Sequence, residues 1–157
     1  RAKIVQLEYV LKVLPWIATI DKFQHGVYTH PAHSREERKE AWMQIMKDFN
    51  SPTIDHAGLE EYQCHLWHKQ LHIFEVPFYY IEYGMAQLGA IAIWKRFREQ
   101  PDEAIGDYLS ALKLGYTRNI REIYEAAGIA FDFSRAYVSE LGAFVKQELG
   151  QLLQQHG

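Results

Sequence analysis

The chain has 157 residues, of which 48% are hydrophobic, 24% are charged and 14% are aromatic. This balance is typical of a globular protein and excludes a disordered segment, so we expect residues 1–157 to form a single domain. The formal net charge of −3 argues against a nucleic-acid partner, and the lone Cys64 excludes a disulfide framework and favours a reducing, cytoplasmic location.

The first predicted helix covers residues 3–29. Its apolar residues recur at helical spacing: Ile4, Leu7, Leu11, Leu14, Ile17, Ala18 and Ile20. Pro15 should kink or divide this helix, because proline removes a backbone donor. Charged residues interrupt the apolar run before it reaches the roughly 18 residues of a membrane span, and no secretory signal is present, so we expect no membrane partner. The segment starts without a helix cap, as in the middle of a helix of a longer chain.

The second predicted helix follows the turn at residues 29–34. Ser34 and Glu37 have the spacing of a capping box. Along this helix four side chains are expected to be buried: Trp42, Ile45, Met46 and Phe49. Asn50, Ser51 and Pro52 should end it.

The rest of the chain also has helical patterns. We expect helices over residues 59–71, from Pro77 to about Arg98, and over residues 102–114, 118–127 and 134–155. Gly115 and Gly128 stand where helix ends favour a left-handed residue, and Ser134 is a predicted N-cap. No alternation typical of strands persists. The sequence therefore predicts an all-α fold of six or seven helices.

Three histidines, His65, His68 and His72, would share one face of the helix predicted over residues 59–71 and its continuation. The stretch HKQLH has the two-histidine frame of a zinc-peptidase helix, but Lys69 stands where that motif needs a glutamate to activate water. One interpretation is an independent metal site, even if only for adventitious ions. The other is that these histidines cap or pair near a helix end, with Cys64 as a small core residue.

The stretch HIFEVPFYYIEYGMAQLGA, residues 72–90, places three tyrosines before a run of small residues. In a helix starting near Pro77, Tyr79 and Tyr80 each lie about one turn from Tyr83. A tyrosine hydroxyl is a neutral donor at pH 7, and a group of such donors suits an oxyanion that forms during acyl transfer. The alternative is that these aromatic residues belong to a core or an interface.

This stretch closely resembles the segment after the active-site core of oligoendopeptidase F and its relatives, zinc metallopeptidases of the thimet-oligopeptidase type. The flanking stretches LPWIATIDKFQH and DYLSALKLGYTRNIREIYEAAGIAFDF resemble the family in the same order. The resemblance therefore covers nearly the whole chain.

The resemblance implies hydrolysis of short peptides at a zinc ion held by an HExxH helix and a downstream glutamate. It also implies that His72 and Tyr83 act in catalysis and that Tyr80 contacts the substrate, with Tyr79 as a second candidate for that contact.

The departure from the family pattern is that no HExxH occurs in the chain. We therefore expect the C-terminal part of such a peptidase, whose partner is the missing N-terminal portion; whether this truncation is natural stays open. The chain itself is expected to bind no zinc and to be inactive alone, since metal activation of water is the large term in this chemistry.

Without the rest of the peptidase, two faces should lose their cover: the apolar face of residues 4–20 and the small-residue face of residues 84–93. Exposed apolar patches mark interfaces, so we expect a homo-oligomer. An alternative function, a non-catalytic helical assembly or binding module derived from the same family, follows from the same patches.

Overall fold

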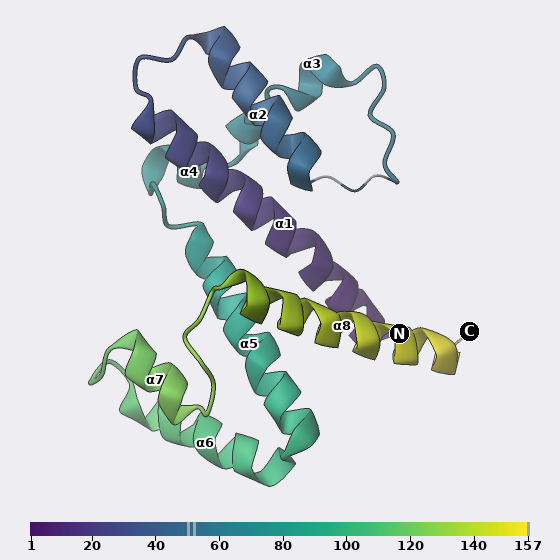
Figure 1. Ribbon diagram of the computed structural model, residues 1–157, viewed down its shortest axis with the longest axis vertical. Coiled ribbons are helices and arrows are strands. Elements are labelled where there is room, and N and C mark those ends of the chain that lie inside the picture. The colour runs from purple at the N-terminus through teal and green to yellow at the C-terminus, as the bar shows by residue number, and fades with distance from the viewer. Residues whose placement is uncertain (50, 52, 157) are drawn as a thin grey trace. The chain divides into compact units, whose positions relative to one another are not determined.

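The computed structural model describes residues 1–49, 51 and 53–156 (Figure 1). In this part of the chain there are eight α-helices, one 3-10 turn and no strand, which confirms the predicted all-α class. The elements are α1 (Ala2–Thr29), α2 (Arg35–Phe49), α3 (Glu60–Gln63), η1 (Leu66–Lys69), α4 (His72–Glu75), α5 (Ile81–Glu99), α6 (Pro101–Leu114), α7 (Ile120–Ala126) and α8 (Arg135–His156).

Helix α1 passes through Pro15 as one element. Of the two effects expected of Pro15, division of the helix is wrong, and a kink stays a prediction. The Thr19 hydroxyl donates to the Pro15 carbonyl oxygen at 2.8 Å, so the turn after the proline carries a side-chain hydrogen bond. Within the described residues, no helix is long and apolar enough to cross a membrane.

The predicted capping box at the start of α2 is confirmed. The Glu37 amide donates to Ser34 Oγ at 3.1 Å, and the Ser34 amide donates to Glu37 Oε2 at 2.6 Å. These bonds hold the pKa of the Glu37 carboxyl below its ordinary value. Trp42, Ile45 and Met46 are buried as predicted.

The expected burial of Phe49 is wrong, because its side chain keeps 36% of its accessible surface at the last turn of α2. Ser51 follows the end of α2 outside any helix, as predicted. The other two predicted breakers, Asn50 and Pro52, lie outside the described residues.

The chain groups into two compact units, and their boundary falls within α1 and within α5. One unit is Val10–Gly84; the other is Arg1–Tyr9 with Met85–Gly157. That the whole chain is a single domain stays a prediction. The core of the first unit is aromatic: Trp42 is fully buried and meets Phe23 edge-on, with ring centroids 5.0 Å apart. Ile20, Ile45, Met46, Trp67 and Ile73 complete this core.

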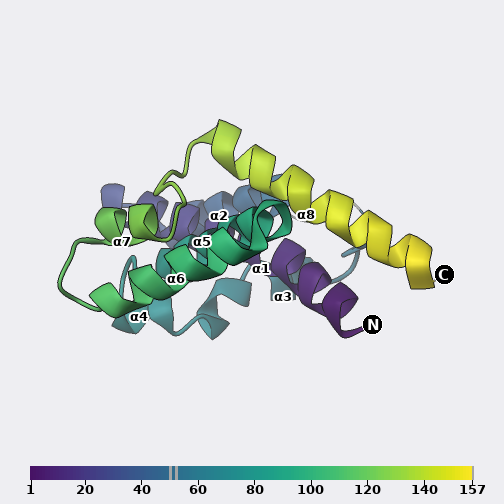
Figure 2. The same ribbon diagram turned by 90° about the horizontal axis from the view of Figure 1, so that it is seen from below.

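The second unit packs α5 beyond Met85 with α6, α7 and α8. Trp94 and Phe144 pack edge to face across α5 and α8, with centroids 4.7 Å apart. Helices α6 and α7 lie side by side (Figures 1 and 2). Gly128 ends the turn after α7 with φ of 70°, as predicted, and a Cβ there would lie 2.5 Å from the Arg96 guanidinium carbon.

One small residue of α5 permits a close approach in the second unit. A Cβ on Gly89 would stand 2.8 Å from the hydroxyl oxygen of Tyr124. That hydroxyl donates to the Met85 carbonyl oxygen at 3.1 Å, and the Tyr124 ring packs on Phe131, so the ring is held in place. Burial raises the pKa of the Tyr124 hydroxyl, which keeps it protonated as a donor.

We therefore predict that Gly89→Ala lowers the free energy of unfolding by about 1–2 kcal/mol, because overpacking outweighs the gain in helix propensity. Gly106→Ala is the matched control: it lies inside α6 with open space around its Cβ position, and should raise stability by roughly 0.5–1 kcal/mol. Urea unfolding followed by circular dichroism measures both. Equal stabilisation by the two substitutions would contradict the close packing at Gly89.

Candidate functional site

The chain between residues 59 and 76 forms three short helical turns rather than one helix, so the predicted helix over residues 59–71 is wrong. α3 ends at Gln63, whose carbonyl oxygen accepts a 2.8 Å hydrogen bond from the buried indole of Trp42. In a continuing helix the same oxygen would accept from the amide of Trp67. Gln70, with φ of −90° and ψ of 88°, separates η1 from α4.

The interruptions divide the predicted histidine face. The rings of His65 and His68 lie 5.4 Å apart near the end of α3 and in η1, whereas His72 begins α4. The HKQLH frame therefore spans two elements, and its histidines are not one turn apart on a helix as zinc-peptidase ligands are. The alternative of a metal protein built on His65, His68 and His72 loses its geometric basis.

Cys64 is buried as predicted and has potential ligand atoms nearby. Its sulfur, a ring nitrogen of His65 and a carboxylate oxygen of Glu61 lie within 4.8 Å of one another. Cys64 Sγ is 3.1 Å and His65 Nδ1 is 2.9 Å from the Glu61 carbonyl oxygen. These are local contacts between side chains and the backbone of the same turn. The Glu61 side chain itself extends into solvent.

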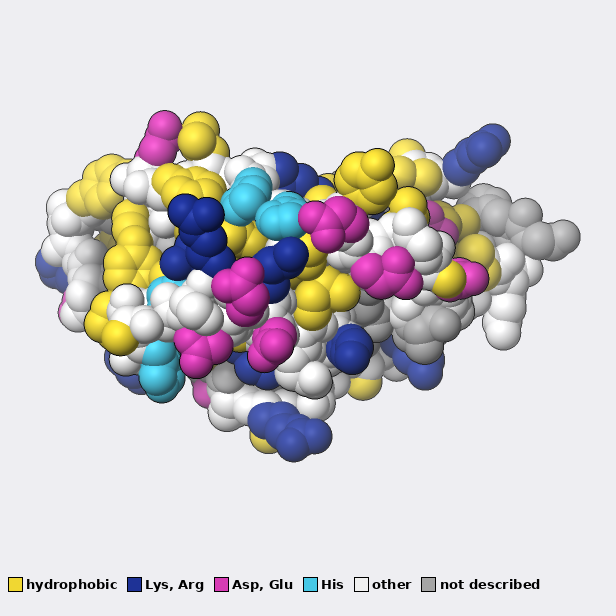
Figure 3. All heavy atoms as spheres, turned by 90° about the horizontal axis from the view of Figure 1, so that it is seen from above, with side chains coloured by type: hydrophobic (Ala, Val, Ile, Leu, Met, Phe, Trp, Pro, Cys, Tyr) yellow, Lys and Arg dark blue, Asp and Glu magenta, His cyan; other side chains and the backbone are white. Residues whose placement is uncertain are grey.

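A pocket of about 370 Å³ opens between α2 and η1. Its lining combines three cations and two histidines with one carboxylate and an indole: Arg35, Glu36, Arg38, Lys39, His65, Trp67 and His68. The Arg38 guanidinium lies over the Trp67 ring at 5.8 Å. Figure 3 shows one face of the molecule, on which Lys and Arg side chains lie beside histidines, with acidic side chains next to them.

The four residues predicted to form the site come together. The ring of His72 lies 4.9 Å from that of Tyr80, 5.7 Å from that of Tyr83 and 6.3 Å from that of Tyr79. Tyr83 also meets Tyr79 at 5.7 Å and Tyr80 at 5.3 Å. We call these four residues the His–Tyr cluster. The structure shows their convergence, while their roles stay predictions.

The local structure that brings the cluster together differs from the single helix that the sequence predicted. α5 begins at Ile81, four residues later than the predicted start at Pro77. Tyr79 and Tyr80 therefore lie in the turn before the helix, and Tyr83 lies in its first turn. The turn is closed by backbone bonds from the Tyr79 amide to Val76 and from the Glu82 amide to Tyr79, at 3.1 and 3.0 Å.

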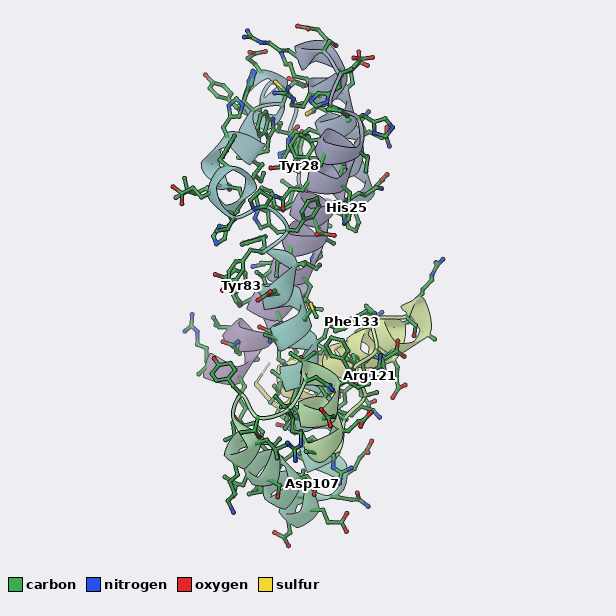
Figure 4. All side chains as sticks on the ribbon, turned by 90° about the vertical axis from the view of Figure 1, so that its left-hand side faces the viewer. His25, Tyr28, Tyr83, Asp107, Arg121 and Phe133 are labelled. Atoms are coloured by element: carbon green, nitrogen blue, oxygen red, sulfur yellow. The ribbon has the colours of Figure 1, made fainter. Side chains whose placement is uncertain are left out.

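Phe78 sets the conformation of this turn. It has φ of 63°, the only positive φ of a non-glycine residue among those described. Its ring lies against His25 and Tyr28 of α1, with centroids 4.9 and 5.3 Å away. Figure 4 shows His25 and Tyr28 along α1 and Tyr83 projecting from the start of α5. The ring contacts hold a backbone conformation that costs about 1–2 kcal/mol in an L-residue.

The cluster can donate hydrogen bonds to a bound molecule. Tyr79 and Tyr83 keep 44% and 48% of their surface, whereas Tyr80 packs against the core. Phenols and a neutral imidazole are donors at pH 7. The arrangement therefore suits a ligand with carbonyl or developing oxyanion oxygens.

Sequence reasoning missed two residues of the site. Gln70 Nε2 lies 2.8 Å from His72 Nδ1, and Phe78 carries the turn. The position of Gln70, two residues before His72, carries no signal in the sequence, because a helix over residues 59–71 would not direct these two side chains toward each other. A positive φ at a phenylalanine has no sequence signature.

Comparisons with known proteins place the chain among peptidases. The model of peptidase family M3 matches residues 7–143. A solved structure of an oligoendopeptidase F is 33% identical, with a TM-score of 0.82 over 95% of this chain and 26% of its own. PZ peptidase A with an inhibitor is 33% identical, with a TM-score of 0.83 over 94% of this chain and 26% of its own.

An oligoendopeptidase F from Bacillus anthracis str. Ames is 30% identical, with a TM-score of 0.70 over 94% of this chain and 23% of its own. Comparison with curated proteins gave no match. The chain thus spans about a quarter of the length of the solved proteins that it resembles.

The strained turn gives a prediction on Phe78. Phe78→Ala and Phe78→Gly both lose the ring contacts, but only the alanine keeps a Cβ at φ of 63°. We predict that Phe78→Gly is more stable than Phe78→Ala by about 1 kcal/mol, the reverse of the usual order. Urea unfolding measures the pair. If the alanine variant is the more stable, the left-handed conformation at residue 78 is wrong.

Proposed function

The chain belongs to peptidase family M3, and from this we propose that it is the C-terminal part of a zinc-dependent oligoendopeptidase of the cytoplasm that hydrolyses short peptides. In this proposal the chain supplies hydrogen bonds to the substrate and to the transition state. Its partner is the N-terminal portion of the peptidase, which carries the metal site, and the chain alone is inactive.

The observation that carries the proposal is the convergence of His72 and Tyr83. Their rings are perpendicular with centroids 5.7 Å apart, although eleven positions separate them. Two donors of this kind can approach one oxygen atom. A carbonyl oxygen gains negative charge when a nucleophile adds to a peptide bond, so donors aimed at it bind the transition state more tightly than the substrate.

Tyr80 and Tyr79 have the proposed role of holding the substrate. Both lie in the turn before α5, and both rings are near that of His72. Tyr80 is fixed against the core and gives a rigid contact, whereas Tyr79 is more exposed and gives an adaptable one. Fixed contacts to the substrate orient the scissile bond before reaction.

The described residues of the His–Tyr cluster do not fit a zinc ion. The cluster offers three phenols and one imidazole, whose Nδ1 is already paired with Gln70. A zinc site in a peptidase takes three nitrogen or carboxylate ligands. We therefore assign zinc to the N-terminal portion, where it would supply an activated water molecule, and assign only hydrogen bonds to this chain.

The test uses the complete peptidase, with this chain as its C-terminal part. Tyr83→Phe removes one hydroxyl and little volume, so we predict a loss of roughly a hundredfold in kcat/KM on a quenched peptide, with unchanged stability. Tyr116→Phe, at a fully exposed position, is the control and should keep full activity.

Two further results would contradict the proposal. Full activity of Tyr83→Phe would exclude a catalytic role for this hydroxyl. Turnover of the peptide by the 157-residue chain alone with added zinc, if a chelator abolishes it, would exclude the assignment of the metal site to the missing portion.

The alternative, a helical assembly module, is supported by an apolar stripe on α6. Ile105, Tyr108, Leu109 and Leu112 follow helical spacing and are all exposed. The two faces expected to lose their cover are partly exposed and partly buried. Leu11, Ala86 and Ala90 are exposed, whereas other members of both faces are covered. Gly84 meets Ile17, Gly89 meets Tyr124, and Ile91 and Ala92 are enclosed. In the first predicted helix, Leu7, Val10, Ile17 and Ile20 are also buried.

The homo-oligomer stays a prediction, and its surface is now assigned to α6. We predict that the chain alone is a dimer at micromolar concentration by light scattering. Leu112→Lys should make it monomeric, because Leu112 keeps 58% of its surface and a buried ammonium is costly. Leu153→Lys on α8, equally an exposed leucine, is the matched control. A monomeric unaltered chain would contradict this.

A further inference from the structure

A chain of hydrogen bonds leads from the aromatic core to His72. The indole nitrogen of Trp16 lies 3.2 Å from Gln70 Oε1, and Gln70 Nε2 lies 2.8 Å from His72 Nδ1. Trp16 is on α1, Gln70 is the residue between η1 and α4, and His72 begins α4. All three belong to the unit Val10–Gly84.

Donor and acceptor chemistry fixes the direction of this chain. An indole N–H can only donate, so the atom of Gln70 that faces it must be the carbonyl oxygen. The amide nitrogen of Gln70 then faces His72, and it too can only donate. His72 Nδ1 must therefore accept, which means that it carries no proton. In the neutral ring the proton is then on Nε2.

Trp16 and Gln70 are both held in place. The Trp16 ring packs against the core, edge-on to Trp42 at 5.9 Å, and the Lys69 ammonium lies over it at 4.7 Å. Gln70 is partly buried, and its backbone is tied on both sides: its amide donates to the Trp67 carbonyl, and its carbonyl accepts from the Ile73 amide. The amide group of Gln70 cannot turn over without setting two donors against each other at Trp16.

We propose that Gln70, oriented by Trp16, is a positioning residue that fixes His72 as the Nε2–H tautomer. The Nε2–H group is then the one donor that the imidazole can offer within the His–Tyr cluster. The catalytic meaning of this tautomer rests on the proposed function, because there His72 donates to the oxyanion. The tautomer itself follows from the hydrogen bonds alone.

The proposal is tested first by nitrogen-15 NMR of the histidine rings of the 157-residue chain. Measurements above about pH 8 keep imidazole neutral, and His72→Phe identifies the His72 signals. We expect Nδ1 to be unprotonated and Nε2 to be protonated, with a preference of at least tenfold, as the loss of one hydrogen bond in the other tautomer implies.

Three variants test the individual hydrogen bonds that link Trp16, Gln70 and His72. Gln70→Glu replaces the amide with a carboxylate, which can only accept hydrogen bonds from the Trp16 indole and from His72. The proton of the neutral His72 ring should therefore move to Nδ1. Gln70→Leu and Trp16→Phe remove the bond or its orienting donor, so the preference should fall towards that of free imidazole. Gln100→Glu makes the same charge change in the other compact unit and should change nothing at His72. A tautomer ratio that is equal in the unaltered chain, Gln70→Glu and Gln70→Leu would overturn the proposal.

The second measurement is the activity of the complete peptidase. Gln70→Glu should lower kcat by at least tenfold with little change in KM, and Trp16→Phe should have a smaller effect in the same direction. If the tautomer responds in NMR while kcat does not, the positioning by Gln70 stands and the catalytic role of His72 fails. If the tautomer does not respond, the positioning fails whatever the activity.

Discussion

The hydrogen bond from the Trp42 indole to the Gln63 carbonyl oxygen is the interaction on which the candidate site depends. Trp42 is fully buried, and a buried indole N–H without a partner is costly. The Gln63 carbonyl, which in a continuing helix would accept from the amide of residue 67, instead accepts from this indole. α3 therefore ends there, and the chain can bring both Trp67 and Ile73 into the core. A single helix over this segment would place His72 elsewhere.

Because the helix predicted over residues 59–71 is interrupted, the candidate site consists of hydrogen-bond donors and not of a row of metal-binding histidines. His65 and His68 stay near α3, and His72 joins three tyrosines instead. The same core that ends α3 also supports the cluster, since Trp16 and Tyr80 both pack against it. A rigid core under a half-exposed group of donors is the arrangement that binding and transition-state stabilisation require, because the donors need no reorganisation when charge develops.

Membership of peptidase family M3 and the likeness to oligoendopeptidase F structures give this cluster its functional context. The second unit contributes differently. In this unit Gly89 of α5 packs against Tyr124, and α6 carries a stripe of exposed apolar side chains. The α6 stripe and the His–Tyr cluster consist of different residues, so the proposed association and the proposed peptide contact can be tested by separate substitutions.

The sequence by itself determined the all-α class, the capping box of Ser34 and Glu37, the left-handed Gly128 and the identity of the four cluster residues, because these follow from local spacing and residue chemistry or from a resemblance in sequence. The tertiary structure alone decided that residues 59–76 break into three turns, that α5 starts at Ile81, and that Gln70 faces His72. Each depends on a partner far along the chain: Trp42 for the end of α3, His25 and Tyr28 for the left-handed Phe78, and Trp16 for the orientation of Gln70. Local periodicity carries no information about such partners, so it predicted one helix where long-range contacts favour three turns.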